Sequence, residues 1–249
     1  MTFLLRLRRL SSEKFLFLKA NSTHTAILIF ARTPEEEAKH KQWVAGSYEA
    51  NIAFSRKLTE HTFKLSQRTE LPIYLINSDE QRGDSFGDRF SHAIEEVFSY
   101  GFEHVVAVGN DTTGLQTQDL LNASKAVQNG KMVLGPSHDG GIYLLGISQS
   151  QYCRKAISSV RWESSLVWRD LQKFSKECHI PVSTLHLKAD LDNSSDFKCF
   201  LRQGGNSLNL GQTLLKISLT HTYYDFDLPL LTLQRCVGQS SLRAPPMVA

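Results

Sequence analysis

Two acidic residues in the middle of the chain each stand beside a short apolar run. Asp111 follows the run 105–108, and Asp139 stands with two glycines just before the run 142–145. In open α/β sheets, ligands bind outside the carboxyl ends of the strands. A carboxylate there can hold Mg²⁺ or Mn²⁺ through oxygen while a diphosphate supplies other ligands. Because such an ion stabilises the departing phosphate in phosphoryl and glycosyl transfer, the two acids suggest a metal–phosphate site.

A third acidic group lies at 190–196, after the last clear apolar run. Asp192 in this group could reach the same ion as Asp111, because carboxylates from separate loops converge at one edge of a sheet. Each acid also has a structural alternative. Asp111 could turn the chain or cap the next helix, Asp-Gly at Asp139 is a common turn, and the third group could cap a short helix over 194–200.

A loop with two glycines, Gly83 and Gly87, leads into a predicted helix over 88–100. Its backbone N–H groups could cradle a phosphate or a base, and Arg89 could reach an anion from the first helical turn. A plain connecting loop is the alternative. Trp162 could similarly stack on a sugar or base, or it could be a packed core residue. No metal-ligand spacing of histidines, G-x-S-x-G elbow, Walker loop or Rossmann fingerprint is present.

The composition is that of an ordinary soluble globular protein, with 41% hydrophobic and 21% charged residues. The formal net charge is +3, and no run of Lys or Arg indicates a nucleic-acid partner. Four scattered cysteines without a C-x-x-C pair favour a reducing compartment over disulfides or zinc. The apolar patches at the start are too short to span a bilayer and make a poor signal peptide. We therefore expect a cytoplasmic protein with no membrane span.

The elements that must position these residues follow from the alternation of apolar runs and helix-forming segments. Strands are predicted at 26–31, 71–76, 105–108, 132–134, 143–146 and 182–187. Helices are predicted within 35–67 and over 88–100, 117–127 and 164–179, with Ser164 as an N-cap and Gly101 as a C-cap. This pattern predicts an α/β fold with a mostly parallel, mixed sheet sandwiched by helices, in which the last strand could be antiparallel.

The pattern covers only part of the chain. We expect a main domain over 25–203, an N-terminal extension over 1–24 and a C-terminal extension over 204–249. Within the last, 208–219 and 220–233 are apolar without a clear period. This extension would pack on the domain or on a partner subunit, which leaves a homodimer open.

In this order, the segments resemble a bacterial family of proposed nucleotide-diphospho-sugar transferases of glycosyltransferase A (GT-A) type. The resemblance covers about 25–200. Its motifs are Phe30-Ala31-Arg32-x-Pro34, the loop with Gln81, Gly83, Gly87 and Arg89, Gly109-Asn110-Asp111-x-x-Gly114-Leu115, Leu134-Gly135-Pro136 with Asp139-Gly140-Gly141-x-Tyr143-x-Leu145-Gly146, Trp162 with Ser164-Ser165, and Asp190-Leu191-Asp192-x-x-x-Asp196. The chain is also similar to nucleotidyltransferases such as phospholactate guanylyltransferase and the molybdenum-cofactor guanylyltransferase.

The resemblance implies a GT-A fold and a role for each motif. Asp111 would be the metal carboxylate of a shortened DxD-type motif, and Asp192 would be the second ligand of Mg²⁺ or Mn²⁺. The segment from Asp139 to Gly141 would line the sugar or acceptor side. Among the acid/base candidates Glu103, His138 and Asp139, we predict Asp139 as the catalytic residue. The implied nucleotide-binding residues are Arg32, Lys39, Lys41, Gly83, Gly87 and Arg89, and the implied substrate-binding residues are Gly140, Gly141, Trp162 and Ser164.

Two departures from the family pattern affect the nucleotide site. After the first strand the family usually has a Pro-Gly turn and a basic K-x-R-type segment, where this chain has Glu35-Glu36-Glu37 before its lysines. These glutamates would repel a diphosphate unless Lys39 and Lys41 turn inward and the acids face solvent. The second departure is Asn110-Asp111-Thr112-Thr113 in place of Ser-Asp-Cys-Pro, which keeps the carboxylate and loses a proline.

Three functions are consistent with these residues. The first interpretation is a metal-dependent glycosyltransferase that moves a sugar from a nucleoside-diphosphate donor to an acceptor hydroxyl. The second is a guanylyltransferase-like nucleotidyltransferase that acts on a phosphorylated small molecule. The third is a catalytically inactive binding protein that keeps the GT-A fold.

Overall fold

The computed structural model describes residues 24–205 and 209–221. Its centre is a six-stranded sheet with the strand order β2-β1-β3-β5-β4-β6. The strands are β1 (Thr25–Phe30), β2 (Ile73–Ile76), β3 (His104–Val108), β4 (Met132–Pro136), β5 (Ile142–Ser148) and β6 (Val182–Thr184). β5 is antiparallel to β3 and β4, and the other pairs are parallel. The predicted mixed α/β sheet is therefore confirmed.

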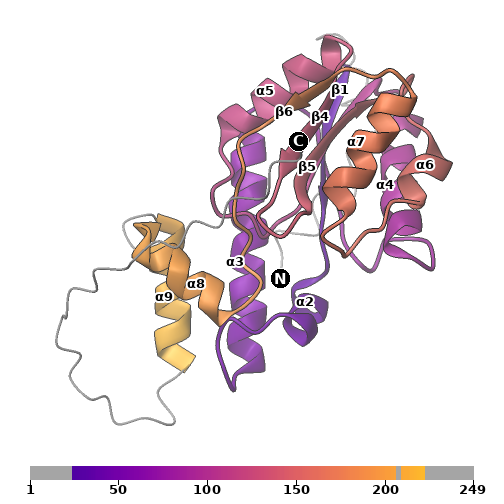
Figure 1. Ribbon diagram of the computed structural model, residues 1–249. Helices are drawn as coiled ribbons and strands as arrows, with labels where there is room; N and C mark the ends of the chain where they lie inside the picture. Colours follow the sequence, from indigo (N-terminus) through magenta and orange to yellow (C-terminus); the bar gives the residue numbers. More distant parts are fainter. Residues whose placement is uncertain (1–23, 206–208, 222–249) are drawn as a thin grey trace, which may run out of the picture.

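Helices cover both faces of this sheet. They are α2 (Pro34–His40), α3 (Tyr48–Gln67), α4 (Phe86–Ser99), α5 (Thr117–Gln128), α6 (Arg154–Ser158), α7 (Val167–Glu177), α8 (Ser194–Arg202) and α9 (Asn209–His221). Figure 1 shows α4, α6 and α7 on one face and α5 with the end of α3 on the other. The described part of the chain contains no helix long and apolar enough to cross a membrane.

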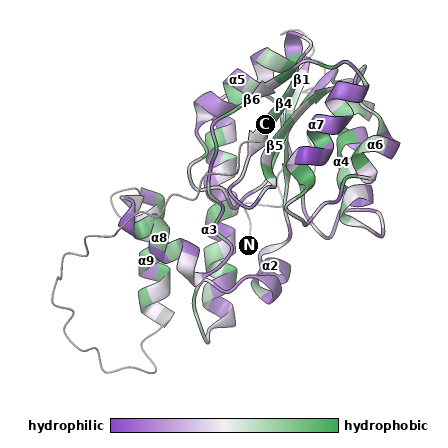
Figure 2. Cartoon of the chain, in the orientation of Figure 1, coloured by the Kyte–Doolittle hydropathy of each residue, from purple (hydrophilic) through white to green (hydrophobic). Residues whose placement is uncertain are grey.

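Burial on both faces explains why the first strand is apolar throughout. Ala26, Leu28 and Phe30 pack into the cluster that includes α4, α6 and α7. Ile27 and Ile29 point the other way and pack against α5. A strand that is covered on both sides shows a continuous hydrophobic run instead of alternation. In Figure 2 the strands are accordingly mostly green, whereas the helices carry purple residues on their outer sides.

The direction of two strands differs from the prediction. The expected antiparallel last strand is wrong, because β6 runs parallel to β4. The antiparallel strand is β5, which follows β4 after only the turn 137–141. A parallel connection needs a crossover of a dozen or more residues, so such a short turn can only reverse the chain.

The helix predicted from Ser164 begins later, at Val167. Ser164 lies in a loop, where its hydroxyl accepts a hydrogen bond from the N–H of Leu166. Glu163 before it has a φ of 59°, in the left-handed region, which does not lead directly into a right-handed helix. The prediction at Gly101 is confirmed, since this residue follows the end of α4 with a φ of +91°.

The helix-forming region 35–67 divides into α2 and α3. The buried Asn51 amide holds the intervening turn: its oxygen accepts from the N–H groups of Trp43 and Val44, and its nitrogen donates to the carbonyls of Val44 and Ser47. Since these bonds satisfy the backbone of the turn, the chain can end α2 and present Lys41 toward the sheet.

A third apolar cluster joins α8 and α9 to the first half of α3, beside the sheet (Figure 1). Phe54 on α3 contacts Phe197 on α8 edge-on, with ring centroids 4.9 Å apart. Leu210 and Leu214 of α9 are buried in the same cluster. The division into a domain over 25–203 and two extensions stays a prediction, and 1–23, 206–208 and 222–249 lie outside the described residues.

Candidate active site

One segment, 188–193, lies across the carboxyl ends of β3 and β4 and brings the acidic groups together. The N–H of Leu191 donates to the carbonyl of Asp111 at 3.0 Å, and the N–H of Lys188 donates to Pro136 at 3.1 Å. On its far side, the indole N–H of Trp43 donates to the carbonyl of Leu191 at 2.9 Å. These bonds fix the segment between the end of α2 and the two strands, which places Asp190 and Asp192 beside Asp111.

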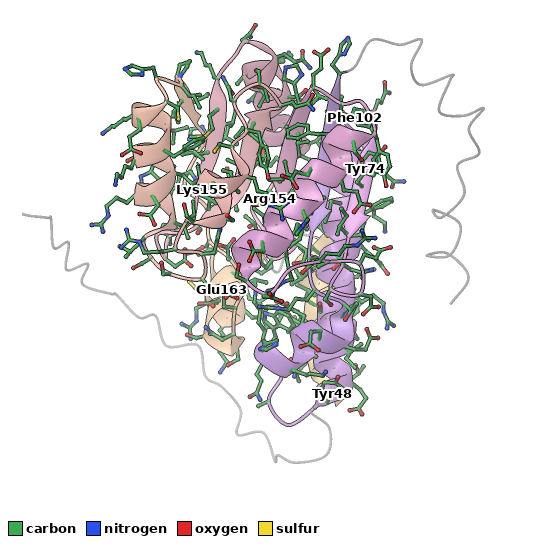
Figure 3. All side chains as sticks on the ribbon, turned by 90° about the vertical axis from the view of Figure 1, so that its right-hand side faces the viewer. Tyr48, Tyr74, Phe102, Arg154, Lys155 and Glu163 are labelled. Atoms are coloured by element: carbon green, nitrogen blue, oxygen red, sulfur yellow. The ribbon has the colours of Figure 1, made fainter. Side chains whose placement is uncertain are left out.

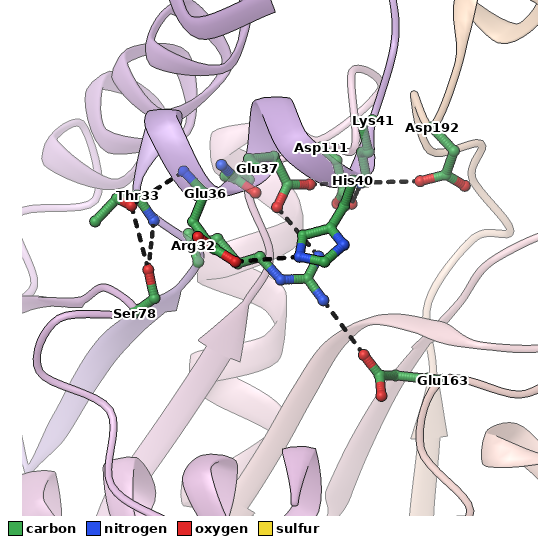
Figure 4. Close-up of polar contacts among 12 residues, drawn as sticks. Arg32, Thr33, Glu36, Glu37, His40, Lys41, Ser78, Asp111, Glu163 and Asp192 are labelled. Carbon is green, nitrogen blue, oxygen red and sulfur yellow. Dashed lines mark hydrogen bonds and ion pairs between the residues drawn. The ribbon is translucent and has the colours of Figure 1, made fainter.

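The Lys41 ammonium lies at the centre of the carboxylates (Figure 4). Its Nζ is 2.6 Å from Asp111 Oδ2, 2.8 Å from Asp192 Oδ1 and 3.1 Å from Glu37 Oε1. The Lys41 side chain is 14% exposed, and that of Glu37 is 6% exposed. The two predicted metal carboxylates therefore converge on one point, and a lysine nitrogen occupies it.

Only one of the three glutamates of α2 faces this site. Glu35 pairs with Arg56 on α3, and Glu36 pairs with Lys39 at 2.7 Å, away from the cluster. Glu37 turns inward, where Lys41 and Arg32 neutralise it. Of the expected inward lysines, Lys41 faces the site and Lys39 is exposed. The repulsion expected from three glutamates therefore falls to one neutralised carboxylate.

Arg32 reaches across the site to a loop from the other side of the sheet. Its guanidinium nitrogens lie 3.3 Å from Glu37 and 3.3 Å from Glu163 (Figure 4). Glu163 is 59% exposed. In Figure 3 it lies below Arg154 of α6 and above Tyr48 of α3. The pair Arg32–Glu163 thus connects the loop after β1 with the loop before α7.

The charges of the cluster depend on each other. Burial alone would lower the pKa of Lys41, but the carboxylates of Asp111, Glu37 and Asp192 raise it above its ordinary value. Burial would raise the pKa of Asp111, and the Lys41 ammonium outweighs this and lowers it. Asp190 has no such cationic partner within 24–205 and 209–221. Burial and the charge of Asp111 therefore raise its pKa to about 7, although Thr112 donates a hydrogen bond to it.

Replacing Asp190 with asparagine should therefore stabilise the protein above neutral pH. Because the pKa of Asp190 is raised in the folded protein, its protonated carboxyl group contributes to the free energy of unfolding near pH 4. This contribution is lost as the pH rises through about 7 and the carboxyl group ionises. The pKa of Asp190 is raised from 3.8 to about 7, and one pKa unit corresponds to about 1.4 kcal/mol, so Asp190→Asn should gain at most about 4 kcal/mol at pH 8 and little at pH 4.5. Urea unfolding at both pH values measures this. An equal difference at the two values would contradict it.

A cavity of about 460 Å³ opens at this edge of the sheet. Most of the predicted site residues line it: Arg32, Lys41, Arg89, Asp111, Asp139, Gly141, Trp162, Ser164 and Asp192. The remaining predicted residues, Lys39, Gly83, Gly87 and Gly140, are not part of its lining. Phe30, Phe86 and Phe90 add an apolar wall. The structure thus brings together most of the residues that were predicted to bind metal, to be catalytic or to bind the substrates.

A second cavity, of about 310 Å³, adjoins the first. Asp139, Asp190 and Asp192 line both cavities. On its other side the second cavity is lined by residues of α8, among them Cys199 and Phe200. The shared aspartates therefore stand between two spaces that could each hold a ligand.

Asp139 combines the two roles considered for it. Its Oδ1 accepts hydrogen bonds from the Ser137 hydroxyl at 2.5 Å and from the N–H of Gly141 at 2.9 Å, which stabilises the β4–β5 turn. The same residue lines both cavities. Gly140 in this turn has a φ of +89°, and a Cβ there would lie 2.4 Å from the carbonyl oxygen of Ser165. The turn is thus held close to the loop before α7.

Trp162 and Gly87 have packing roles. The indole N–H of Trp162 donates to the carbonyl of Ile157, and its ring lies 5.2 Å from Phe86 and 5.1 Å from Phe90. Gly87 is buried in the first turn of α4, where a Cβ would lie 2.4 Å from the carbonyl oxygen of Ser158. Trp162 also lines the first cavity, so both alternatives stated for it have support.

The substitution Gly87→Ala should lower the free energy of unfolding by about 1–3 kcal/mol, because overpacking against a backbone carbonyl outweighs the helix preference of alanine. Gly114→Ala is the matched control, since a Cβ there meets its nearest atom, Lys188 Cδ, at 3.8 Å. Urea unfolding of both variants measures the difference. Equal stability of the two would contradict the overpacking at Gly87.

Two residues of the site are not among those predicted from the sequence. The third acidic group contains Asp190, but only Asp192 of this group is predicted as a ligand. These two aspartates are two residues apart in an extended segment, a spacing that places both side chains on the same face. Glu37 was interpreted as a repulsive charge, although its position four residues before Lys41 on a helix indicates an ion pair.

The carboxylates fit a hard cation in part. Asp111 and Asp192 each direct one carboxylate oxygen at Lys41 Nζ, so the lysine ammonium lies where a metal cation could bind. Among the described residues, no group of three or more His, Cys, Asp or Glu side chains is arranged to hold a metal ion. Phosphates or water would have to complete the coordination of Mg²⁺ or Mn²⁺. The metal therefore stays a prediction.

Comparison with known proteins supports the fold and finds a family pattern in part of the chain. No curated protein matches the chain in sequence. The chain resembles the structure of a proposed nucleotide-diphospho-sugar transferase from Desulfovibrio desulfuricans G20, with 19% identity over 82% of this chain and 100% of that chain, at a TM-score of 0.69.

Two further solved structures superpose more loosely. They are CMP:2-keto-3-deoxy-manno-octonic acid synthetase complexed with CTP, with 9% identity over 74% of this chain and 99% of that chain at a TM-score of 0.44, and Rv0371c from Mycobacterium tuberculosis, with 12% identity over 73% and 99% at 0.41. Residues 45–164 match the model of a family described as uncharacterized proteins conserved in bacteria (DUF2064). The predicted resemblance is thereby confirmed: the chain carries the DUF2064 sequence pattern over 45–164, on a fold shared with a proposed nucleotide-diphospho-sugar transferase.

Proposed function

We propose that this protein transfers a sugar from a nucleoside-diphosphate donor to a hydroxyl group of an acceptor. Two adjoining cavities that share three aspartates carry this proposal. A group-transfer enzyme has to hold two substrates with their reacting atoms in contact, and carboxylates at the junction can act on both.

The first cavity suits the donor. Its lining includes Arg32, Lys41 and Arg89, whose positive charges can pair with a diphosphate, and an aromatic wall that can hold a base or sugar. A divalent cation at Asp111 and Asp192 would supply further stabilisation of the departing nucleoside diphosphate. In this proposal the donor phosphates lie toward the end of α2, and the sugar lies toward Asp139.

The second cavity suits an acceptor that carries hydroxyl groups. It is lined by four aspartates, Asp139, Asp190, Asp192 and Asp196. Its described lining contains no lysine or arginine. A phosphorylated acceptor would be repelled by these carboxylates, whereas sugar-like hydroxyls can donate hydrogen bonds to them. This charge pattern favours glycosyl transfer over nucleotidyl transfer to a phosphorylated small molecule.

In the proposed reaction one proton is transferred, one bond to the anomeric carbon forms and another breaks. The acceptor hydroxyl attacks the anomeric carbon of the donor, and its proton passes to Asp139 at the junction of the cavities. The bond between the anomeric carbon and the phosphate oxygen breaks, and the nucleoside diphosphate leaves with Arg32 and Lys41 beside it.

The alternative of an inactive binding protein was based on the repulsion expected from three glutamates. Only Glu37 of these glutamates faces the site, and Arg32 and Lys41 neutralise its charge, so this argument for the alternative no longer applies.

A product assay tests the proposed function. The protein is incubated with UDP-, GDP- or dTDP-sugars, Mn²⁺ and a set of hydroxylated acceptors, and the released nucleotide is measured. We expect a free nucleoside diphosphate with at least one donor. Release of pyrophosphate from a nucleoside triphosphate would instead establish nucleotidyl transfer, and absence of heat with every donor in calorimetry would support a binding protein for other ligands.

A cytoplasmic location is part of this proposal and rests on the scattered thiols. Cys153, Cys178 and Cys199 are exposed free cysteines, and Cys236 lies outside the described residues. The homodimer suggested by the C-terminal segment stays a prediction.

A further inference from the structure

We propose that Lys41 occupies the cation position between Asp111 and Asp192 and has to leave it before a divalent ion can bind. The proposal rests on the proposed function, because it concerns the ion expected beside the donor diphosphate. It adds a step to that function: binding of the ion is an exchange of one cation for another.

The geometry leaves one position for two cations. Lys41 Nζ lies 2.6 Å from Asp111 Oδ2 and 2.8 Å from Asp192 Oδ1. Mg²⁺ binds carboxylate oxygens at about 2.0–2.1 Å. An ion that contacts both oxygens would therefore lie almost on the lysine nitrogen, and two positive charges at such a short distance repel each other strongly.

Lys41 is held firmly in this position. It follows α2 as the C-cap residue, where the negative end of the helix dipole favours a cation. Glu37, one turn earlier on the same helix, adds a third carboxylate contact at 3.1 Å and is almost fully buried. A divalent ion thus competes with a cation that the chain itself supplies at high effective concentration.

Release of Lys41 does not leave its charge without partners. Glu37 comes from the same helix and can keep its contact, since it does not belong to the pair of predicted metal carboxylates. Lys41 also lines the first cavity, where the donor phosphates are proposed to lie. Phosphate oxygens would replace the two lost carboxylates, so ion and diphosphate should assist each other in binding.

Direct measurement of Mn²⁺ binding to the full-length protein tests the exchange. Free Mn²⁺ is followed by electron paramagnetic resonance during titration of the wild type, Lys41→Met and Lys39→Met. We expect Lys41→Met to bind Mn²⁺ at least about tenfold more tightly than the wild type, because a competing charge is removed. Lys39→Met is the matched control, since Lys39 is exposed and pairs with Glu36, and it should bind like the wild type.

Two results would overturn the proposal. One is a wild type that binds Mn²⁺ as tightly as Lys41→Met. The other is a gain in Lys41→Met that survives the additional change Asp111→Asn, because the ion would then bind elsewhere. If Lys41→Met does not fold, the pair Glu37→Gln and Glu37→Gln/Lys41→Met gives the same comparison with one carboxylate fewer.

The experiments can contradict the cation exchange and the proposed function independently of each other. Turnover of a nucleotide-sugar donor without a gain of Mn²⁺ affinity in Lys41→Met overturns the exchange alone. A gain of affinity without turnover of any donor supports the exchange at this site and counts against sugar transfer.

Discussion

Asp139→Asn should slow sugar transfer by about 10²–10⁴-fold, the usual contribution of a general base, while donor binding stays within a factor of about two. An asparagine cannot take the proton of the acceptor hydroxyl. Its side-chain oxygen can still accept the hydrogen bonds that the Ser137 hydroxyl and the N–H of Gly141 donate to Asp139 Oδ1. The turn should therefore keep its shape, and the loss should appear in kcat, with little change in the donor Kd measured by calorimetry.

Asp190→Asn serves as the comparison, because Asp190 lines the same two cavities. The raised pKa of Asp190, about 7, also suits a proton acceptor near neutral pH. If Asp139→Asn retains its rate and Asp190→Asn loses it, the base is Asp190 and the assignment to Asp139 is wrong. A rate that falls in both variants by the full amount would indicate that the two carboxylates act as a unit.

Lys41→Met should lower the free energy of unfolding by about 3 kcal/mol, at the lower end of the cost of removing one partner of a buried ion pair. Methionine fills a similar volume but leaves Glu37, Asp111 and Asp192 without their shared cation. Glu37 is the most buried of them, at 6% exposed, whereas Asp192 is 50% exposed and can be hydrated. Urea unfolding at neutral pH and low salt measures this loss.

Two further variants separate the charge cluster from helix effects. Lys39→Met removes an exposed lysine from the same helix, and loss of its solvent-exposed ion pair with Glu36 should change stability little. Glu37→Gln/Lys41→Met should regain part of the stability, because it removes the most buried unpaired carboxylate. Equal losses in Lys41→Met and Lys39→Met would show that the buried cluster contributes no more than a surface pair.

The sheet was predictable from local patterns because its strands are covered on both faces. Apolar runs such as 26–31 and 105–108 mark these strands directly. The direction of β5 could also have been derived, since the turn before it is too short for a crossover. α9 was missed, although Leu210, Leu214 and Ile217 have helical spacing, because other leucines around the same helix obscure the period.

The charge cluster was less predictable because it depends on contacts between distant segments. Lys41 and Asp192 meet only where the segment 188–193 passes over the ends of β3 and β4, and no local pattern specifies that path. The sequence did place Asp111 and Asp139 at the correct edge. It did not indicate that a lysine would lie between the predicted metal carboxylates.

The path of 188–193 also determines where this protein could be redesigned to accept other compounds. The segment bridges to Gln42, Thr112 and Ser137 through its backbone, so inserting one residue would displace Asp190 and Asp192 from Asp111 and reshape both cavities. The second cavity is also lined by Cys199 and Phe200 of α8 and by Gln203, which follows the end of that helix. A library of substitutions at these positions would vary acceptor choice and leave the donor side and its charges unaltered.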